Sequence, residues 1–398
     1  MLYKIAIENF FSIADRQELT FEVPGNAPDL DCFRLSRSNG VTRLPTVIGF
    51  FGPNASGKST VLRAAVSAIL FAGNSFNWTD EIDLLFQPYR HQNWWGKPTK
   101  ILLEFDSQLS PDAPQTIFRY ELHIAHKARN FSNKTVAYEA LSYAPKGKFR
   151  CLFERNNQQF HFGKEFGIPN TSDSRKDSIR ENASVISTLE KFNHSLSIFL
   201  KRLIAASQSN VIGVNRIQPT ISQLLGTYAA DKMCLDNLNH ELRRLDLGLE
   251  SMTIEQSPQG WFAKFKHIGL DDFIFLPEES AGTRRFIEIF PRLHYALANG
   301  SIAFIDELDT ECHPLLLPEL LRWFNDPERN PHGAQLIFTA HNSSLLNDLE
   351  KEQIFLTEKL SGQSTHIYGA RDIKGLRREP SLMKKYLSGE LGAIPHIG

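Results

Sequence analysis

The chain has 398 residues, of which 41% are hydrophobic and 22% are charged, and its formal net charge is −1. At about 150 residues per folded unit, this length predicts two or three core-forming units in a globular protein. Because the net charge is close to zero, the composition does not indicate a nucleic-acid binder, although a local basic patch remains possible.

The distribution of apolar residues and cysteines indicates the cellular compartment of the protein. It has no long uninterrupted apolar stretch, so we expect no membrane span, and Met1–Glu8 alternates like a strand rather than like a signal peptide. The cysteines are scattered and form no C-x-x-C pair, which argues against a zinc site or a disulfide framework. We therefore expect a protein of the reducing cytoplasm.

The N-terminal segment predicts strands before the first motif. Met1–Val23 reads as two alternating strands joined near Ser12–Gln17, and Pro24–Asn39 is polar and expected to be a loop. Thr46–Phe51 is an apolar run with strand character, and Ser59–Ala72 has helix character. The residues between them therefore connect a strand to a helix.

Residues 52–60 match the complete G-x-x-x-x-G-K-[ST] pattern of a phosphate loop. A glycine-rich turn that carries a lysine by chance is the alternative, but the flanking strand and helix supply the context that the motif requires. The glycines let backbone N–H groups turn towards an anion, and the helix N-terminus adds a positive dipole end. The motif predicts a nucleoside triphosphate bound by Gly52, Pro53, Asn54, Ala55, Ser56, Gly57, Lys58, Ser59 and Thr60.

Two residues of this loop have distinct expected roles. Lys58 would reach the β- and γ-phosphates, and the Ser59 hydroxyl would hold Mg²⁺. The chain has no complete N/T-K-x-D motif for reading guanine, so ATP is favoured over GTP.

The middle of the chain predicts a strand-rich unit followed by a helical one. Short alternating segments separated by turns indicate an antiparallel meander, and the polar stretch Gly167–Arg180 reads as a boundary. We expect ATPase-core halves at 1–99 and 251–398, an antiparallel β subdomain at 100–166 and a helical insert at 167–250. The meander strands are Lys100–Phe105, Thr116–Ile124, Thr135–Tyr143, Arg150–Glu154 and Gln159–Phe162.

The predicted helical insert contains two amphipathic stretches. The second runs from about Thr220 to Leu245, and strand character returns at Ser251–Glu255 and Gly260–Lys266. The first carries an apolar stripe that is interpreted as core-facing, with a partner-binding face as the alternative. Its residues are Val185, Leu189, Phe192, Leu196, Phe199 and Leu203.

Two further apolar strands end in residues that suit nucleotide chemistry. Ser301–Ile305 leads into Asp306 and Glu307, the Walker B pattern, in which Asp306 would hold Mg²⁺ through water and Glu307 would orient and deprotonate the attacking water. Leu336–Ala340 leads into His341, which could contact the γ-phosphate; a structural histidine is the simpler alternative.

A second anion-binding helix start is predicted at Glu279–Arg284. Ser280 and the small residues after it offer a hydroxyl and exposed N–H groups before an apolar helix. A simple helix cap is the alternative. Because one nucleotide already has one phosphate loop, a second phosphate-binding cap suggests sites built from two protomers.

This ordered set of motifs resembles the ABC-type ATPase superfamily, and more closely its RecF, SMC and OLD branch. Within that branch the chain resembles the bacterial AAA15/AAA21-type ATPases of anti-phage defence operons. The residues that carry the finer resemblance occur at both ends of the chain. They are Ile7-Glu-Asn-Phe-Phe-Ser-Ile13, Glu279-Ser-Ala-Gly-Thr-Arg284, Ile305-Asp-Glu-Leu-Asp309, His313-Pro314, Phe338-Thr-Ala-His-Asn342 and Tyr386-Leu-Ser-Gly-Glu-Leu-Gly-Ala-Ile-Pro395.

The resemblance implies an α/β fold: an ABC-type P-loop ATPase head with a mixed sheet, an antiparallel β subdomain and an inserted helical lobe. It also implies that two heads sandwich ATP and Mg²⁺, with Ser280 and Gly282 of one protomer contacting the γ-phosphate held by Lys58 of the other. His313 occupies the D-loop position. Gln87 is the candidate Q-loop glutamine, with Gln92 as a nearby competitor.

Several roles remain open to such an ATPase. A transporter subunit is disfavoured because long inserts separate Lys58 from the signature, and too few residues follow His341 for the Toprim domain of an OLD nuclease. We favour a homodimeric or larger ATPase that regulates a separately encoded nuclease or toxin, without membrane association. The alternative is a RecF-like DNA-binding ATPase that uses the basic cluster Arg371, Lys374, Arg377, Arg378, Lys384 and Lys385.

Overall fold

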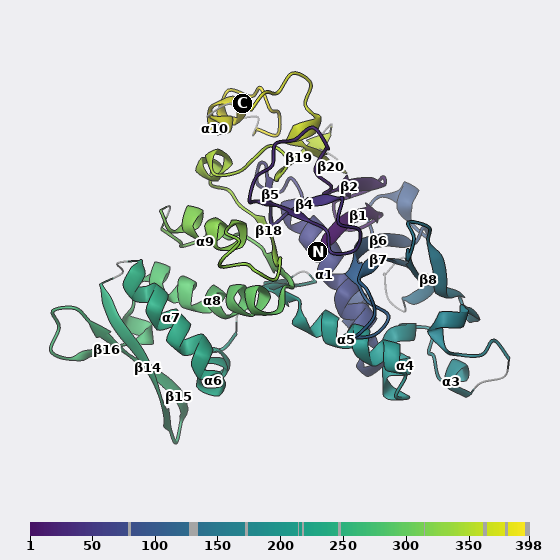
Figure 1. Cartoon of the computed structure of the whole chain (residues 1–398), viewed down its shortest axis with the longest axis horizontal. Coiled ribbons are helices and arrows are strands. Elements are labelled where there is room, and N and C mark those ends of the chain that lie inside the picture. The colour runs from purple at the N-terminus through teal and green to yellow at the C-terminus, as the bar shows by residue number, and fades with distance from the viewer. Residues whose placement is uncertain are drawn as a thin grey trace.

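A computed structural model shows two large β-sheets, three smaller ones of two or three strands, and two large hydrophobic cores among the described residues (Figure 1). Pro314 and Pro395, which belong to motifs quoted above, lie outside the residues that the structure describes. The structure describes residues 1–78, 81–126, 134–171, 174–213, 215–216, 219–245, 248–313, 315–360, 364–378 and 381–394.

The first sheet is antiparallel and contains the predicted meander. Its strand order is β10-β9-β8-β7-β6-β1-β2. Along β7 buried and half-buried side chains alternate, as expected for a strand with one face on a core. The predicted meander strands are confirmed. The strands are β1 Leu2–Glu8, β2 Gln17–Thr20, β6 Thr99–Ser107, β7 Thr116–Ala125, β8 Thr135–Tyr143, β9 Arg150–Asn156 and β10 Gln159–Phe162.

The expected boundary between residues 1–99 and 100–166 does not divide the structure. β1 pairs with β6 in antiparallel register, with Leu2 opposite Phe105 and Ile7 opposite Ile101. The N-terminal strands therefore belong to the sheet of the meander. Alternation within a segment predicts a strand but carries no information about its distant partner.

The second sheet is parallel except for its last strand, in the order β11-β17-β18-β5-β19-β20. β5, β17 and β18 are buried at every position, which explains their unbroken apolar sequences. Because parallel strands end at one edge, the residues that follow these three strands come together there. The strands are β5 Val47–Phe51, β11 Gln208–Ser209, β17 Ile302–Ile305, β18 Gln335–Thr339, β19 Ile354–Leu360 and β20 Ser364–Gly369.

Helix α1, Lys58–Asn74, follows the phosphate loop as predicted and lies between the two sheets (Figure 1). Its core receives Leu103 from the first sheet and Ile48 and Phe50 from the second. Among the described residues, one helical segment, Lys58–Asn77, is long and apolar enough to cross a membrane, and 67% of its apolar window is buried in the protein. Its position between two sheets is that of a core helix.

The opposite face of the parallel sheet forms the second core. β5 sends Val47 and Phe51 to this side, alternating with the residues that it sends towards α1. Of the elements on this side, α6, α7, β14–β16 and α8 form a lobe that extends away from the antiparallel sheet (Figure 1). The elements on this side are α6 Ile221–Ala230, α7 Lys232–Arg244, β14 Leu249–Ser257, β15 Gly260–His267, β16 Phe273–Phe275, α8 Ala281–Asn299, α9 Leu316–Asn325 and α10 Leu382–Leu387.

The predicted helical insert at 167–250 is divided between the two cores. Residues of α4 and α5 pack with α1 in the first core, whereas those of α6 and α7 pack with α8 in the second. The remaining elements are α3 Ser174–Asp177, α4 Val185–Lys191, α5 Ser195–Ala206, α2 Glu81–Leu85, β3 Phe33–Leu35, β4 Arg43–Pro45, β12 Val211–Ile212 and β13 Asn215–Arg216.

Both amphipathic stretches are also interrupted. The first breaks at Asn193, which has a left-handed φ of 57°, and His194 caps the second half. Phe192 and Leu203 are consequently 41% and 39% exposed, so the predicted core stripe is wrong at these two positions. The second stretch breaks at Asp231, whose side chain accepts the N–H of Cys234 and starts α7.

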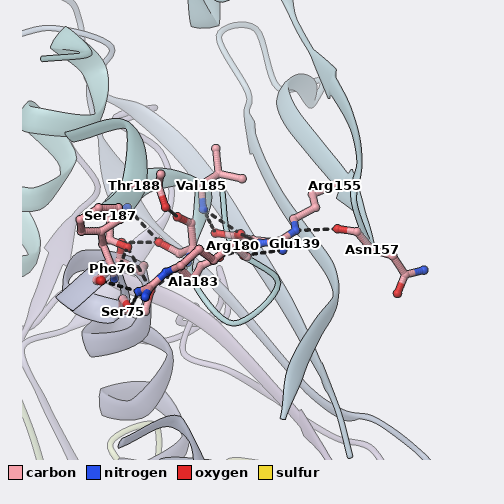
Figure 2. A network of polar contacts seen from close by, with 12 residues as sticks. Ser75, Phe76, Glu139, Arg155, Asn157, Arg180, Ala183, Val185, Ser187 and Thr188 are labelled. Atoms are coloured by element: carbon pink, nitrogen blue, oxygen red, sulfur yellow. Dashed lines mark hydrogen bonds and ion pairs between the residues drawn. The ribbon is translucent and has the colours of Figure 1, made fainter. Parts of the chain in front are cut away.

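A buried ion pair joins the meander to the start of α4 (Figure 2). Glu139 of β8 and Arg155 of β9 are fully buried, with Oε2 and Nη1 3.7 Å apart. Glu139 Oε2 accepts the N–H of Val185 at 3.0 Å, and Arg155 Nη1 donates to the carbonyl of Ala183 at 2.6 Å. Burial raises the pKa of Glu139 to about 7. The network fixes the start of α4 against the antiparallel sheet.

The predicted fold class is confirmed. A sheet with parallel strands carries the phosphate loop, an antiparallel sheet covers one side of α1, and a lobe that contains helices covers the other side of the parallel sheet. This arrangement is a mixed α/β architecture.

Candidate functional site

The phosphate loop leaves the end of β5 in a conformation that requires its glycines. Gly52 and Gly57 have φ values of 148° and 106°. A Cβ at Gly52 would lie 2.2 Å from the carbonyl oxygen of Thr357, and one at Gly57 would lie 2.2 Å from Thr365 Oγ1. Both threonines belong to the β19–β20 hairpin. This hairpin packs so closely against the loop that only glycine fits at positions 52 and 57.

Lys58 holds an ammonium group over the loop. Its Nζ donates to the carbonyls of Gly52 at 2.9 Å and Pro53 at 3.0 Å, and lies 3.4 Å from Nδ1 of His341. Burial lowers the pKa of Lys58, while the nearby carboxylates of Asp306, Asp309 and Glu307 oppose that shift. The acids that follow β17 therefore favour the charged form of this lysine.

Thr339, the last residue of β18, braces both acids of the Walker B pattern. Its Oγ1 donates to Asp306 Oδ1 at 2.7 Å and accepts the N–H of Glu307 at 2.7 Å. Asn210 brackets Asp306 from the other side, through bonds to its backbone N–H at 2.7 Å and carbonyl at 2.9 Å. Asp306 is 5% exposed, so this bracing holds a carboxylate at a buried position.

Glu307 and His341 lie beside each other at the open side of the edge. Glu307 has a left-handed φ of 51°, a conformation that costs a non-glycine residue about 1 kcal/mol or more. Its Oε1 lies 3.9 Å from Nε2 of His341, and both side chains are about 40% exposed. Backbone strain of this kind concentrates at functional sites, where it aims a side chain.

An open cleft of about 1110 Å³ is lined by most of the phosphate loop together with Glu307 and His341; Asp306 lies behind its lining. Four cationic side chains line it, against one carboxylate, which suits a polyphosphate ligand. The predicted site residues in its lining are Asn54, Ala55, Ser56, Gly57, Lys58, Ser59, Thr60, Gln87, Glu307 and His341; the other lining residues are Phe11, Ser12, Arg63, Leu84, Pro88, Tyr89, Arg90 and Lys359.

The predicted Mg²⁺ ligands fit a metal that keeps most of its own water. In the described part of the chain, no group of three or more His, Cys, Asp and Glu side chains is arranged to hold a metal ion. Ser59 lines the cleft, and one oxygen of Asp306 is engaged by Thr339 while the other accepts no hydrogen bond from a described residue. A hydroxyl and one carboxylate, completed by water and phosphate oxygens, are the usual protein ligands of Mg²⁺.

Gln87, and not Gln92, lines the cleft. The backbone carbonyl of Gln87 accepts the N–H of Phe11 at 2.7 Å, and its side-chain amide donates to the carbonyl of Asp83. Ser12 of the same N-terminal motif lies 2.9 Å from the hydroxyl of Thr60. The motif at Ile7–Ile13 therefore borders the phosphate loop.

The signature residues do not enter this cleft. Ser280 is exposed and caps α8, accepting the N–H of Thr283 at 3.1 Å, as the simpler alternative for this motif expected. A Cβ at Gly282 would lie 3.0 Å from the carbonyl oxygen of Glu311. His313 is also exposed, and its Nδ1 accepts the N–H of Leu315 at 3.2 Å. The segments around Gly282 and Glu311 thus adjoin each other, and neither lines the cleft that holds Lys58.

Sequence reasoning missed several residues that shape the site. Thr339 lies within a quoted motif, so its position before His341 was an available signal. Asn210, Thr357 and Thr365 reach the site only through strand pairing and loop contacts, which no local pattern predicts. Arg63 follows the phosphate loop by one helical turn and could have been found from that spacing.

The C-terminal basic cluster is partly used inside the molecule. Arg371 donates to the backbone carbonyls of Thr20 and Glu22. Arg378 pairs with Glu350 and Glu352, and Lys385 pairs with Glu390. Half of the cluster is therefore engaged by this chain, which weakens the argument for a phosphate-backbone surface.

Comparison with solved structures finds SMC head domains. The chain is 13% identical to the SMC head domain from Thermotoga maritima, with a TM-score of 0.44, covering 92% of this chain and 98% of that one. The chain is 12% identical to an SmcHead bound to the C-winged helix domain of ScpA, with a TM-score of 0.47, covering 92% of this chain and 97% of that one. It is also 12% identical to an Smc head domain with an extended coiled coil, bound to the C-terminal domain of ScpA derived from Pyrococcus furiosus. The TM-score is 0.46, and the match covers 93% of this chain and 97% of that one.

Comparison by sequence gives a family. No curated protein matches the chain. Residues 47–347 match the family model described as "AAA domain, putative AbiEii toxin, Type IV TA system". The match begins at β5 and includes the phosphate loop, the signature, Asp306, Glu307 and His341, and it covers well over half of the chain. The chain therefore belongs to this AAA-domain family.

Proposed function

We propose that this protein binds and hydrolyses Mg·ATP, and that two protomers close around the nucleotide. The observation that carries the proposal is the cleft at the edge of the parallel sheet, which gathers Lys58, Ser59, Glu307 and His341 from three different segments. Binding alone would not need an exposed carboxylate beside a histidine at the mouth of a phosphate loop.

The side chains of the cleft divide the work of hydrolysis. Lys58 and the backbone N–H groups of the loop bind and orient the β- and γ-phosphates. Glu307 orients the attacking water and accepts its proton, and His341 contacts the γ-phosphate. Mg²⁺, held by Ser59 and through water by Asp306, would neutralise charge that develops on the phosphates.

The second protomer supplies what the cleft lacks. Ser280 and Gly282 lie outside the cleft of their own chain, at an exposed helix N-terminus that is suited to an anion. In the proposed dimer they approach the γ-phosphate bound by the partner's phosphate loop. His313, on the adjoining segment, would lie at the same interface.

We further propose that head closure controls a separately encoded effector, a nuclease or toxin, in the cytoplasm and as part of anti-phage defence. The family description names a toxin and a Type IV TA system, which supports a two-component arrangement. A partner that binds open and closed heads with different affinity would couple ATP to the effector.

A RecF-like DNA-binding ATPase is the second candidate. Lys374, Arg377 and Lys384 are exposed and could contact phosphates. The engagement of Arg371, Arg378 and Lys385 within the chain makes it the weaker proposal.

Purification of a tagged Glu307→Gln variant from its native host with Mg·ATP tests the proposal. A closed dimer that brings down one operon-encoded protein supports the effector model and identifies the effector. A dimer with DNA alone supports the second candidate. A monomer at saturating ATP contradicts the shared-site mechanism of both.

A further inference from the structure

Asp309 makes two hydrogen bonds that link the acids after β17 to the loop after β18. Its Oδ2 accepts the backbone N–H of His341 at 2.8 Å and that of Asn342 at 2.6 Å. Hydrogen bonds to an ionised acceptor are roughly twice as strong as neutral ones. The carboxylate therefore holds the backbone of the very residue whose imidazole enters the cleft.

The other oxygen of Asp309 points to the same conclusion. Oδ1 is buried and accepts no hydrogen bond from a described residue. A buried acceptor without a partner is costly, so the two hydrogen bonds of Oδ2 to the loop must offset that cost. The carboxylate also opposes the lowering of the Lys58 pKa that burial causes.

The loop has its own cap and does not need Asp309 to fold. Asn342 Oδ1 accepts the N–H of Ser344 at 3.0 Å and its hydroxyl at 2.7 Å, which starts the 3-10 helix Ser343–Asn347. The N–H of Ala340 donates to the carbonyl of Phe50 at 3.2 Å. Between these two fixed points, Asp309 restrains the backbone of His341 directly.

We propose that Asp309 is a positioning residue for His341. By holding the two N–H groups, it places the imidazole 3.4 Å from Lys58 Nζ and 3.9 Å from Glu307 Oε1. The inference rests on the proposed ATPase function and adds a residue to it. Asp309 is not among the described residues that line the cleft, and in this proposal it acts through the imidazole.

Three variants of Asp309 separate geometry from charge. Asp309→Asn keeps an oxygen that can accept both N–H groups, so kcat should stay close to the wild-type value. Asp309→Glu keeps the charge but moves the carboxylate by one methylene, and Asp309→Ala removes it. Both should lower kcat by about 100-fold, the cost of a misplacement near 1 Å. The Kd for ATP should change less than about twofold in all three.

The controls tie the effect to His341. In a His341→Ala background, Asp309→Ala should cause almost no further loss of kcat. Asp326 also accepts a backbone N–H, that of Glu328 at 2.8 Å, but lies outside the cleft, so Asp326→Ala should leave kcat unchanged. Thermal melting of each variant establishes that it is folded, and Asp309→Glu replaces Asp309→Ala if the latter is not.

Normal kcat in folded Asp309→Ala or Asp309→Glu would overturn the inference, as would additive losses with His341→Ala. A loss in Asp309→Asn as large as in Asp309→Ala would overturn it too, because charge and not position would then matter. Absence of ATP hydrolysis by the wild-type dimer would instead refute the proposed function itself.

Discussion

The carboxyl edge of the parallel sheet and the N-terminus of α8 differ in how much of their polar chemistry one chain completes. At the sheet edge, Thr339 braces Asp306, and Lys58 approaches His341 within a single protomer. At α8, the hydroxyl of Ser280 contacts only Thr283 among the described residues, through the backbone N–H that it caps and through the side-chain hydroxyl. The side chains at the sheet edge are therefore positioned by contacts within one chain, whereas the contacts at α8 only form the start of the helix. The proposed dimer accounts for this difference, because in it a second molecule would complete the signature region.

Replacing Glu307 by glutamine should have the largest effect and sharpen the contrast. Loss of the proton acceptor should lower kcat by about 1000-fold, while ATP binding persists because Lys58 and the loop are intact. Hydrolysis and the mass of the assembly would be measured at saturating Mg·ATP. Glu328→Gln, at an exposed position outside the cleft, is the matched control. Unchanged kcat in Glu307→Gln would remove the carboxylate from the mechanism.

Replacing Lys58 by alanine tests the sheet edge alone. Loss of a charged donor to the phosphates should weaken ATP binding by about 3 kcal/mol, or about 100-fold in Kd. Equilibrium binding of a fluorescent ATP analogue is the measurement, with the exposed Lys97→Ala as control. An unaltered Kd would contradict the phosphate-loop assignment.

Replacing Glu139 by alanine should change stability and neither nucleotide region. The variant leaves Arg155 buried without its partner carboxylate, which should lower the free energy of unfolding by about 3 kcal/mol. Glu121→Ala, on the neighbouring strand and half-exposed, should cost much less. Chemical denaturation measures both, and a change in ATP affinity of Glu139→Ala would link the network to the site.

The same residue predicts a pH dependence of stability. The pKa of Glu139 is raised from 4.5 to about 7 in the folded protein, so the folded state binds a proton more tightly than the unfolded state does. Its contribution to stability is therefore fully present below pH 4.5 and is lost as the pH rises towards 7. Glu139→Gln should flatten this part of the profile, and an unchanged slope would contradict the assignment.

The smallest expected effect distinguishes two glutamines. Gln87 lines the cleft and Gln92 does not, so Gln87→Ala should lower kcat by about fivefold, the value of one hydrogen bond, while Gln92→Ala should not change it. Steady-state hydrolysis of the two variants decides between them. Equal activities would leave the Q-loop position unassigned.

Local patterns predicted the parts of this molecule that local physics determines. The alternation in Thr116–Ile124 and the apolar run Thr46–Phe51 predicted strands, and the structure shows that the first buries one face and the second is fully buried. The common edge of the parallel strands explains why three motifs meet. The pairing of β1 with β6 and the bracing of Asp306 by Asn210 depend on residues far apart in the chain. No periodicity within a segment encodes such contacts, so the sequence could not reveal them.

The helix breaks were a different kind of miss. The apolar spacing around Phe192 continues across Asn193, yet that residue adopts a left-handed φ and His194 and Asp231 provide caps. The helix prediction relied on the apolar spacing and did not use these polar residues, although residues of this kind favour helix ends.

Mixing two inactive variants tests the central claim, that each nucleotide site is built from two protomers. Lys58→Ala lacks a working phosphate loop but retains its signature, and Ser280→Arg retains its phosphate loop but places a bulky cation at the signature. In a mixed dimer, one site combines the intact loop with the intact signature. The account predicts that each variant alone hydrolyses no ATP and that their mixture recovers activity. Normal hydrolysis by Ser280→Arg alone, or no recovery on mixing although mixed dimers form, would contradict it.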